Sequence, residues 1–299
     1  SALLFCDPDR REFNMLIQFE HVNLGQENGK FSPRTLADGE LADVMSTWQE
    51  TLGERGWNAL YLENHDQPRA VSRFGDPHGA WYESATALAT AYFLQRGTPF
   101  IYQGQEIGML GGHFTRPSDF RDVESLNYLS AHPGEGVPAG LAAISRDNGR
   151  TPMQWDSSPA AGFTSGTPWI DLPPSASSIH VERQLADASS VLAFYRALID
   201  ARHRVPALTT GSFRRVDAGD PGLFVYVRSS EGSEVLVMTN LTGRAITPRG
   251  VFLDEDLSPS RWGLYLGNVA SPIDSSEAEA GDPLPSSTMA PWEARVYLR

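Results

Sequence analysis

A short apolar segment runs directly into a dense cluster of polar side chains in the stretch Ala59-Leu-Tyr-Leu-Glu-Asn-His-Asp-Gln-Pro-Arg69. Residues 59–63 have the composition of a buried β-strand, and Pro68 stops the strand from continuing. In folds with parallel sheets, functional sites are built at the carboxyl ends of the strands. We therefore expect residues 63–69 to lie at the rim of a parallel sheet.

Strand-like and helix-like patterns alternate on both sides of this stretch. Further strand candidates occupy residues 15–21 and 100–102, and helical patterns occupy residues 41–55, 84–95 and 191–204. This alternation predicts βα units and a parallel sheet, so the fold class is α/β. Three strands are too few to close a barrel, which needs about 250 residues.

The remainder of the chain has a different texture. Residues 110–185 are rich in Gly, Pro, Asp and Ser, which predicts long loops with short helices. From residue 206 onwards, β-rich runs are separated by turn residues, at 212–216, 223–228, 234–239 and 294–298, and the stretch 271–288 is typical of a surface loop. We expect one domain over residues 1–205 and an all-β antiparallel sandwich over residues 206–299.

The composition excludes several classes of protein. Among 299 residues, 24 Lys and Arg stand against 37 Asp and Glu, a formal net charge of −13. Duplex nucleic acid and anionic membranes select for basic surfaces, so neither is an expected partner. No apolar run approaches the roughly 18 residues of a membrane helix. The single cysteine, Cys6, excludes an internal disulfide and a cysteine-based zinc site.

Two polar clusters are candidates for chemistry. His65 and Asp66 follow the central strand candidate, although an aspartate there could equally cap the next helix. Arg146, Arg150 and Trp155 lie in one long-loop segment. Arginine donors and a flat aromatic face suit a polar ligand such as a sugar; the alternative is an Arg–Asp network that orders the loop.

Other features predict less. Glu106 follows the third strand candidate, where it could act as an acid or base or accept hydrogen bonds from backbone groups. The seven histidines are scattered and indicate no metal site, and no phosphate loop or dinucleotide-binding glycine pattern predicts a cofactor. The chain begins at Ser1 with neither an initiator methionine nor a signal-peptide pattern, so we expect a processed product or a fragment.

Taken in order, these motifs resemble the oligo-1,6-glucosidase and α-glucosidase branch of glycoside hydrolase family 13, the α-amylase superfamily. The matching segments include Phe19-Glu-His21, residues 61–69 with 72–75, 97–109, 146–156, 162–164 and 168–170. The resemblance implies the C-terminal part of a (β/α)8 TIM barrel followed by the antiparallel domain. It implies that the segments before His21 and His65, with 100–102, are barrel strands six to eight.

The resemblance also implies an activity. This family hydrolyses α-glucosidic bonds with retention, releasing terminal glucose from short oligosaccharides such as isomaltose or maltose. Retention needs two carboxylates about 5–5.5 Å apart. In the family the nucleophile and the acid/base follow the fourth and fifth strands, which the resemblance places outside this chain. We therefore expect the chain alone to be inactive and poorly folded, with the N-terminal barrel half as its partner.

Site roles follow residue by residue from the resemblance. Asp66, with His65, is implied to hold the 2- and 3-hydroxyls of the sugar and to stabilise the transition state. Arg146 matches an arginine that contacts the terminal glucose. Arg69 and Arg150 are carried over as further substrate-binding residues, Arg69 near the second sugar and Arg150 in the loop. A structural role is the competing interpretation for Arg150 and Glu106.

Two alternatives to an α-glucosidase stay open. A transglycosylating relative, such as a sucrose isomerase or a trehalose-forming enzyme, would share the chemistry and could act on sucrose. A non-catalytic barrel homologue, like the heavy chains of amino-acid transporters, would serve as an interaction module. A cytoplasmic location is the family's default, and the lone Cys6 is compatible with it.

Overall fold

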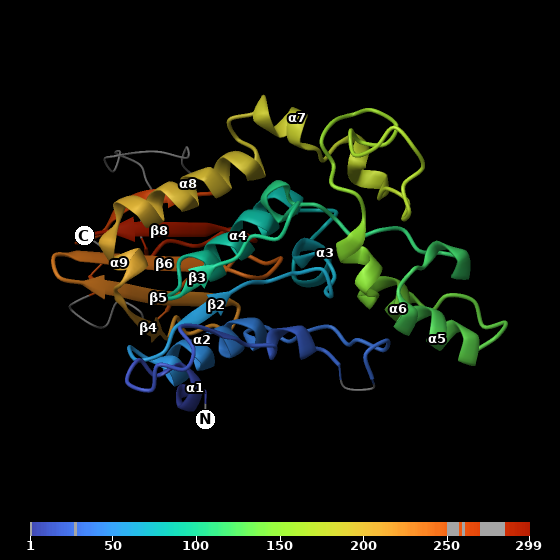
Figure 1. Ribbon diagram of the computed structural model, residues 1–299. Helices are drawn as coiled ribbons and strands as arrows, with labels where there is room; N and C mark the ends of the chain where they lie inside the picture. The colour runs from blue at the N-terminus through green and yellow to red at the C-terminus, as the bar shows by residue number, and fades with distance from the viewer. Residues whose placement is uncertain (1, 27–28, 250–256, 259–260, 270–284) are drawn as a thin grey trace.

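A small parallel sheet forms the centre of the N-terminal half. The computed structural model describes residues 2–26, 29–249, 257–258, 261–269 and 285–299 (Figure 1). The sheet contains β1 (Leu16–Ile17), β2 (Asn58–Leu60) and β3 (Thr98–Pro99), in the order β1-β2-β3, and all pairings are parallel. The predicted parallel sheet is confirmed.

The strands are shorter than the sequence predicts. The range 100–102 is not a strand: the ladder ends at Pro99, and the Phe100 amide then donates one more hydrogen bond to the Leu60 carbonyl oxygen, at 2.7 Å. The neighbouring strand β2 ends at Leu60, so among the described residues the apolar side chains that follow Phe100 have no strand to pair with. Backbone pairing ends where either partner leaves the sheet, whatever the side-chain period.

Three helices lie close to the predicted ranges: α2 (Glu40–Leu52), α4 (Trp81–Phe93) and α8 (Val191–Arg204). Two short helices that the sequence pattern did not predict are also present, α1 (Leu3–Cys6) and α3 (Ala70–Phe74). Helix α2 ends before Gly53, whose φ of 51° lies in the left-handed region, a few residues short of the predicted range. All ten residues from Ser84 to Phe93 are buried, because α4 lies in the middle of the molecule (Figure 1).

The predicted long loops are found between α4 and α8. They carry α5 (Val123–Ala131), α6 (Ala139–Ile144), α7 (Val181–Leu185) and several short 3-10 turns. Figure 1 shows α5 and α6 in a lobe at the far end of the molecule from the antiparallel sheet. The lobe has its own small core of Phe114, Phe120, Leu129, Leu141 and Ile170.

An antiparallel sheet follows α9 (Pro206–Thr209). Its strands are β4 (Ser212–Val216), β5 (Leu223–Ser230), β6 (Ser233–Asn240), β7 (Gly263–Gly267) and β8 (Ala294–Leu298), in the order β4-β5-β6-β8-β7. The predicted antiparallel character is confirmed. Within the described residues one sheet is present, and a single bridge joins Ile246 to Met289. Most of the loop expected at 271–288 lies outside the described residues.

The two faces of the antiparallel sheet bury different neighbours. Side chains alternate along each strand, so Phe224 and Tyr226 on β5 pack with the helices, while Val225 and Val227 point the other way. That second face is covered by side chains that include Ile246, Leu257, Trp262 and Met289.

Two buried arginines, one on α8 and one on the antiparallel sheet, donate to carbonyl oxygens at the C-terminal end of α4. Arg202 of α8 donates to the carbonyl oxygens of Phe93, Gln95 and Gly97 at 2.7–2.9 Å. Arg228 of β5 donates to Leu94 at 2.6 Å and also to the carbonyl oxygens of Leu208, Gly211 and Ser212. Carbonyls at a helix C-terminus lack intrahelical donors and carry partial negative charge, so buried guanidiniums satisfy both needs.

We expect Arg228→Met to lower the free energy of unfolding by about 3 kcal/mol, because several buried carbonyl oxygens lose a charged donor. Arg204→Met is the matched control. Arg204 pairs with Asp200 on the surface at 2.9 Å, and such exposed pairs are worth about 0.5 kcal/mol. Chemical denaturation followed by far-UV circular dichroism measures both. Similar losses for the two variants would contradict the role given to Arg228.

Candidate active site

The loop after β2 is closed at its base by an ion pair and is ordered at its tip by hydrogen bonds to Asn64. Glu63 and Arg69 pair at 2.9 Å with both side chains buried. Inside the loop, the Asn64 side-chain oxygen accepts from the Asp66 amide at 2.8 Å, and the Asn64 carbonyl oxygen accepts from the Gln67 amide at 3.2 Å. The loop therefore presents His65 and Asp66 at the carboxyl end of the strand, as predicted.

Asp66 is surrounded by three basic side chains. Its Oδ1 lies 2.7 Å from Nη2 of Arg150 and 3.5 Å from Nη1 of Arg146, and its Oδ2 lies 3.3 Å from Nε2 of His65. The Asp66 side chain is still 42% exposed and that of His65 is 70% exposed. Four of the predicted site residues, from two segments about 80 positions apart, are thus brought together on an accessible surface.

A residue that the sequence analysis missed holds Arg146 in place. Asp122, directly before α5, accepts from Nε of Arg146 at 2.7 Å, and its other oxygen accepts from the Ser125 amide and hydroxyl. Burial by itself raises the pKa of Asp122, but the hydrogen bonds from Ser125 and Arg146 hold it below its usual value. The available signal was an aspartate at a helix N-cap position, which is too common to stand out.

Arg69 does not join the other site residues. Its side chain is fully buried, where it pairs with Glu63 and donates to the Gln103 carbonyl oxygen at 2.7 Å, with its guanidinium 5.1 Å from the centre of the Tyr102 ring. Contact with a sugar does not fit this burial, so Arg69 is a support of the loop in this structure. Burial also raises the pKa of Glu63.

Glu106 occupies the position of a backbone anchor. Its Oε2 accepts from the Gly104 amide at 2.8 Å, and burial raises its pKa. This agrees with the structural interpretation made from the sequence. Across the part of the chain that the structure describes, no group of three His, Cys, Asp or Glu side chains is arranged to hold a metal ion. In the same part, no helix is long and apolar enough to cross a membrane.

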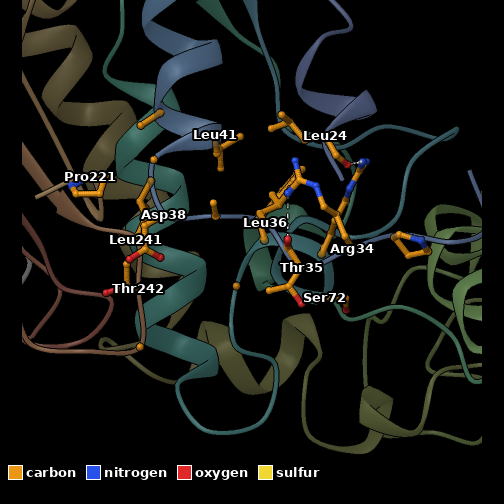
Figure 2. A pocket seen from close by; sticks show the side chains of 18 of the residues that line it. Leu24, Arg34, Thr35, Leu36, Asp38, Leu41, Ser72, Pro221, Leu241 and Thr242 are labelled. Atoms are coloured by element: carbon orange, nitrogen blue, oxygen red, sulfur yellow. Dashed lines mark hydrogen bonds between the residues drawn. The ribbon is translucent and has the colours of Figure 1, made fainter. Parts of the chain in front are cut away.

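A cavity of about 500 Å³ lies apart from this site. Figure 2 shows its wall, which is lined by Leu36 from the segment before α2, by Leu41 of α2, and by Leu241 and Thr242, which follow β6. Arg34 lies at one side and donates to the Thr35 carbonyl oxygen at 3.1 Å. None of the predicted site residues lines this cavity, so the candidate active site rests on the cluster around Asp66.

The chain belongs to the α-amylase family, glycoside hydrolase family 13: the family model described as alpha amylase, catalytic domain, matches residues 1–211. It is 41% identical over 306 residues to an oligo-1,6-glucosidase of Halalkalibacterium halodurans, covering 99% of this chain and 52% of the relative. It is 37% identical over 303 residues to a trehalose-6-phosphate hydrolase of Bacillus subtilis, with the same coverage. The family predicted from the motifs is confirmed.

Solved structures agree in fold. The trehalose-6-phosphate hydrolase of Bacillus licheniformis matches with a TM-score of 0.86 and 34% identity, over 99% of this chain and 53% of that one. The isomaltulose synthase of Klebsiella sp. LX3 matches with a TM-score of 0.84 and 32% identity, over 100% and 53%. The fold is that of the α-amylase family, with a TIM-barrel part and an antiparallel sheet. The chain spans about half the length of the relatives it matches.

Acid is expected to destabilise the protein through His21, which follows β1. The ring is buried against Tyr61 at 4.6 Å, and burial lowers its pKa to about 4. An unfolded histidine has a pKa of about 6.5, so between pH 6.5 and 4 the unfolded state binds the proton more readily. The free energy of unfolding is expected to fall by about 3 kcal/mol as the pH falls through this window.

Denaturation curves at a series of pH values measure this effect. His21→Gln removes the titrating ring and should flatten the dependence in this window, whereas replacement of the exposed His113 by glutamine should leave it in place. A wild-type slope in the His21 variant would assign the acid sensitivity to other groups.

Proposed function

We propose that this chain supplies the C-terminal part of a retaining α-glucosidase of the oligo-1,6-glucosidase type, which removes terminal α-linked glucose from short oligosaccharides such as isomaltose or maltose. The observation that carries the proposal is the accessible carboxylate of Asp66, held at the carboxyl end of β2 with His65 and Arg146 beside it. The identity to oligo-1,6-glucosidases over nearly the whole chain supports it.

The chemistry assigned to Asp66 is stabilisation of the transition state. A carboxylate accepts hydrogen bonds from sugar hydroxyls, and these strengthen as positive charge develops on the sugar ring. His65 adds a second polar contact next to Oδ2, and the guanidinium of Arg146 supplies donors for the terminal glucose. The nucleophile and the acid/base would come from barrel strands four and five.

In this proposal β1, β2 and β3 are barrel strands six, seven and eight, and the barrel part ends at residue 205. Helix α8 ends at Arg204, and the family match ends at residue 211, which supports a boundary there. Residues 206–299 then form the antiparallel domain.

The partner that completes the site is the N-terminal half of the barrel. Within the described residues β1 and β3 each pair only with β2, which leaves both outer edges of the sheet open. Large apolar side chains lie exposed beside them: Ile17 is 53% exposed, Phe19 57%, Phe100 46% and Ile101 37%. Further barrel strands would pair with these edges and bury this surface.

A second candidate is a transglycosylating enzyme that isomerises sucrose. Structures titled trehalulose synthase and isomaltulose synthase match this chain as well as the hydrolases do, with TM-scores of 0.85 and 0.84. The two candidates share Asp66 and differ in the acceptor of the glucosyl group. Product analysis after incubation with maltose, isomaltose and sucrose separates them. A non-catalytic interaction module would turn over none of these.

The activity is best measured in a chimera in which this chain replaces the matching part of the Halalkalibacterium halodurans oligo-1,6-glucosidase. We expect the chimera to release glucose from isomaltose, and Asp66→Asn to lower kcat/KM about 1,000-fold, because the amide cannot replace the charge of the carboxylate. Asp171→Asn, at an exposed position, is the control and should retain activity.

The isolated chain is expected to show no turnover of maltose or isomaltose, since both primary carboxylates are proposed to lie outside it. Turnover by the purified 299 residues would overturn that part of the proposal. An active chimera whose kcat/KM is unchanged by Asp66→Asn would overturn the role of Asp66.

A further inference from the structure

The two segments that form the site touch backbone to backbone at Gly149. This glycine lies in the 3-10 turn Arg146–Arg150 and faces the loop after β2. A Cβ placed on Gly149 would lie 2.7 Å from the Gln67 carbonyl oxygen and 2.8 Å from that of Asn64. Its φ is not positive, so the requirement for glycine here is one of space and not of backbone conformation.

Hydrogen bonds on both sides of this contact fix the turn to the loop. The Tyr102 hydroxyl donates to the Gly149 carbonyl oxygen at 2.8 Å. Arg150 donates from Nε to the His65 carbonyl oxygen at 2.8 Å and from Nη2 to Oδ1 of Asp66 at 2.7 Å. Both bonds depend on the distance between the two backbones, because the Arg150 guanidinium is a rigid fork.

The contact is also tied to the base of the loop. The ring of Tyr102 packs against the guanidinium of Arg69, which pairs with Glu63 at the far end of the loop. Contacts therefore connect three segments to one another: residues 63–69, Tyr102 and residues 146–150. Asp66 lies in the first of them and is accessible to solvent. Any change in the spacing at Gly149 is passed to the carboxylate through Arg150.

We propose that Gly149, Tyr102 and Arg150 are positioning residues that set the location of the Asp66 carboxylate, with the close approach at Gly149 as the contact on which the others depend. The inference rests on the proposed function for its kinetic consequence and on the contacts alone for its structural consequence. Displacement of a group at a reaction centre by about 1 Å can cost about 100-fold in rate.

Gly149→Ala is the direct test, made in the chimera described above. Its methyl group must push the turn away from the loop. We expect kcat/KM to fall about 100-fold, mainly through kcat, and hydrogen exchange at the Asp66 and Gln67 amides to become faster.

Gly211→Ala is the matched control, because its Cβ would lie 2.4 Å from the Ala207 carbonyl oxygen and 2.8 Å from that of Ser229, equally crowded but beside the antiparallel sheet. It should lower the thermal midpoint and leave kcat/KM and exchange in residues 64–67 unchanged.

Tyr102→Phe tests the same contact without adding any atom, so it guards against misfolding of the alanine variant. Loss of one hydroxyl donor should lower kcat/KM about 5-fold while the thermal midpoint moves little. Unchanged exchange in residues 64–67 of a folded Gly149→Ala protein, or unchanged kcat/KM in both variants of an active chimera, overturns the inference. An inactive unsubstituted chimera contradicts the proposed function instead, and the exchange measurement then decides on the positioning role.

Discussion

Donation from two buried guanidiniums to the carbonyl oxygens around the end of α4 is the interaction on which the rest of the structure depends. Helix α4 packs against α3, α8, β6 and β8, and its side chains share a core cluster with Leu60 of β2. Its C-terminal end points into this interior, where unpaired carbonyls would be costly. Arg202 and Arg228 remove that cost, and neither has a carboxylate partner among the described residues. The parallel sheet and the antiparallel sheet are thereby fastened to the same helix end.

The candidate site differs from this interior in its electrostatics. Its charged side chains pair with opposite charges and stay accessible to solvent, whereas Arg202 and Arg228 are buried and donate to carbonyl oxygens. Asp66 shares its Oδ1 between two arginines, and Asp122 takes the larger share of Arg146. Pairing holds the carboxylate in one place, as the proposed role of stabilising developing positive charge requires. The Asp66 side chain remains 42% exposed, which leaves room for the sugar of the proposed function. The buried pair of Glu63 and Arg69 has no such freedom and serves only to close the loop.

Sequence patterns located the elements and part of the site, for reasons that particular residues make clear. Asp66 and Arg146 could be placed because each stands at a position where the local pattern and the family motif agree. Arg69 was misjudged because its side chain points inward to Glu63, to the Tyr102 ring and to the Gln103 carbonyl oxygen. The last two lie more than 30 positions away in the sequence. Gly149 could not be identified, because its role lies in the carbonyl oxygens of Asn64 and Gln67 across the fold.

The ion pair between Asp122 and Arg146 has a consequence for the exchange of parts between related enzymes. Asp122 lies directly before α5, and Arg146 is the first residue of the turn that returns to the site. Their ion pair therefore joins the two ends of the segment that carries α5 and α6. A lobe grafted from a relative would therefore replace everything between two fixed anchor points. Shuffling of this segment can vary the lobe without moving the Asp122–Arg146 pair, provided that the aspartate and the arginine are inherited together.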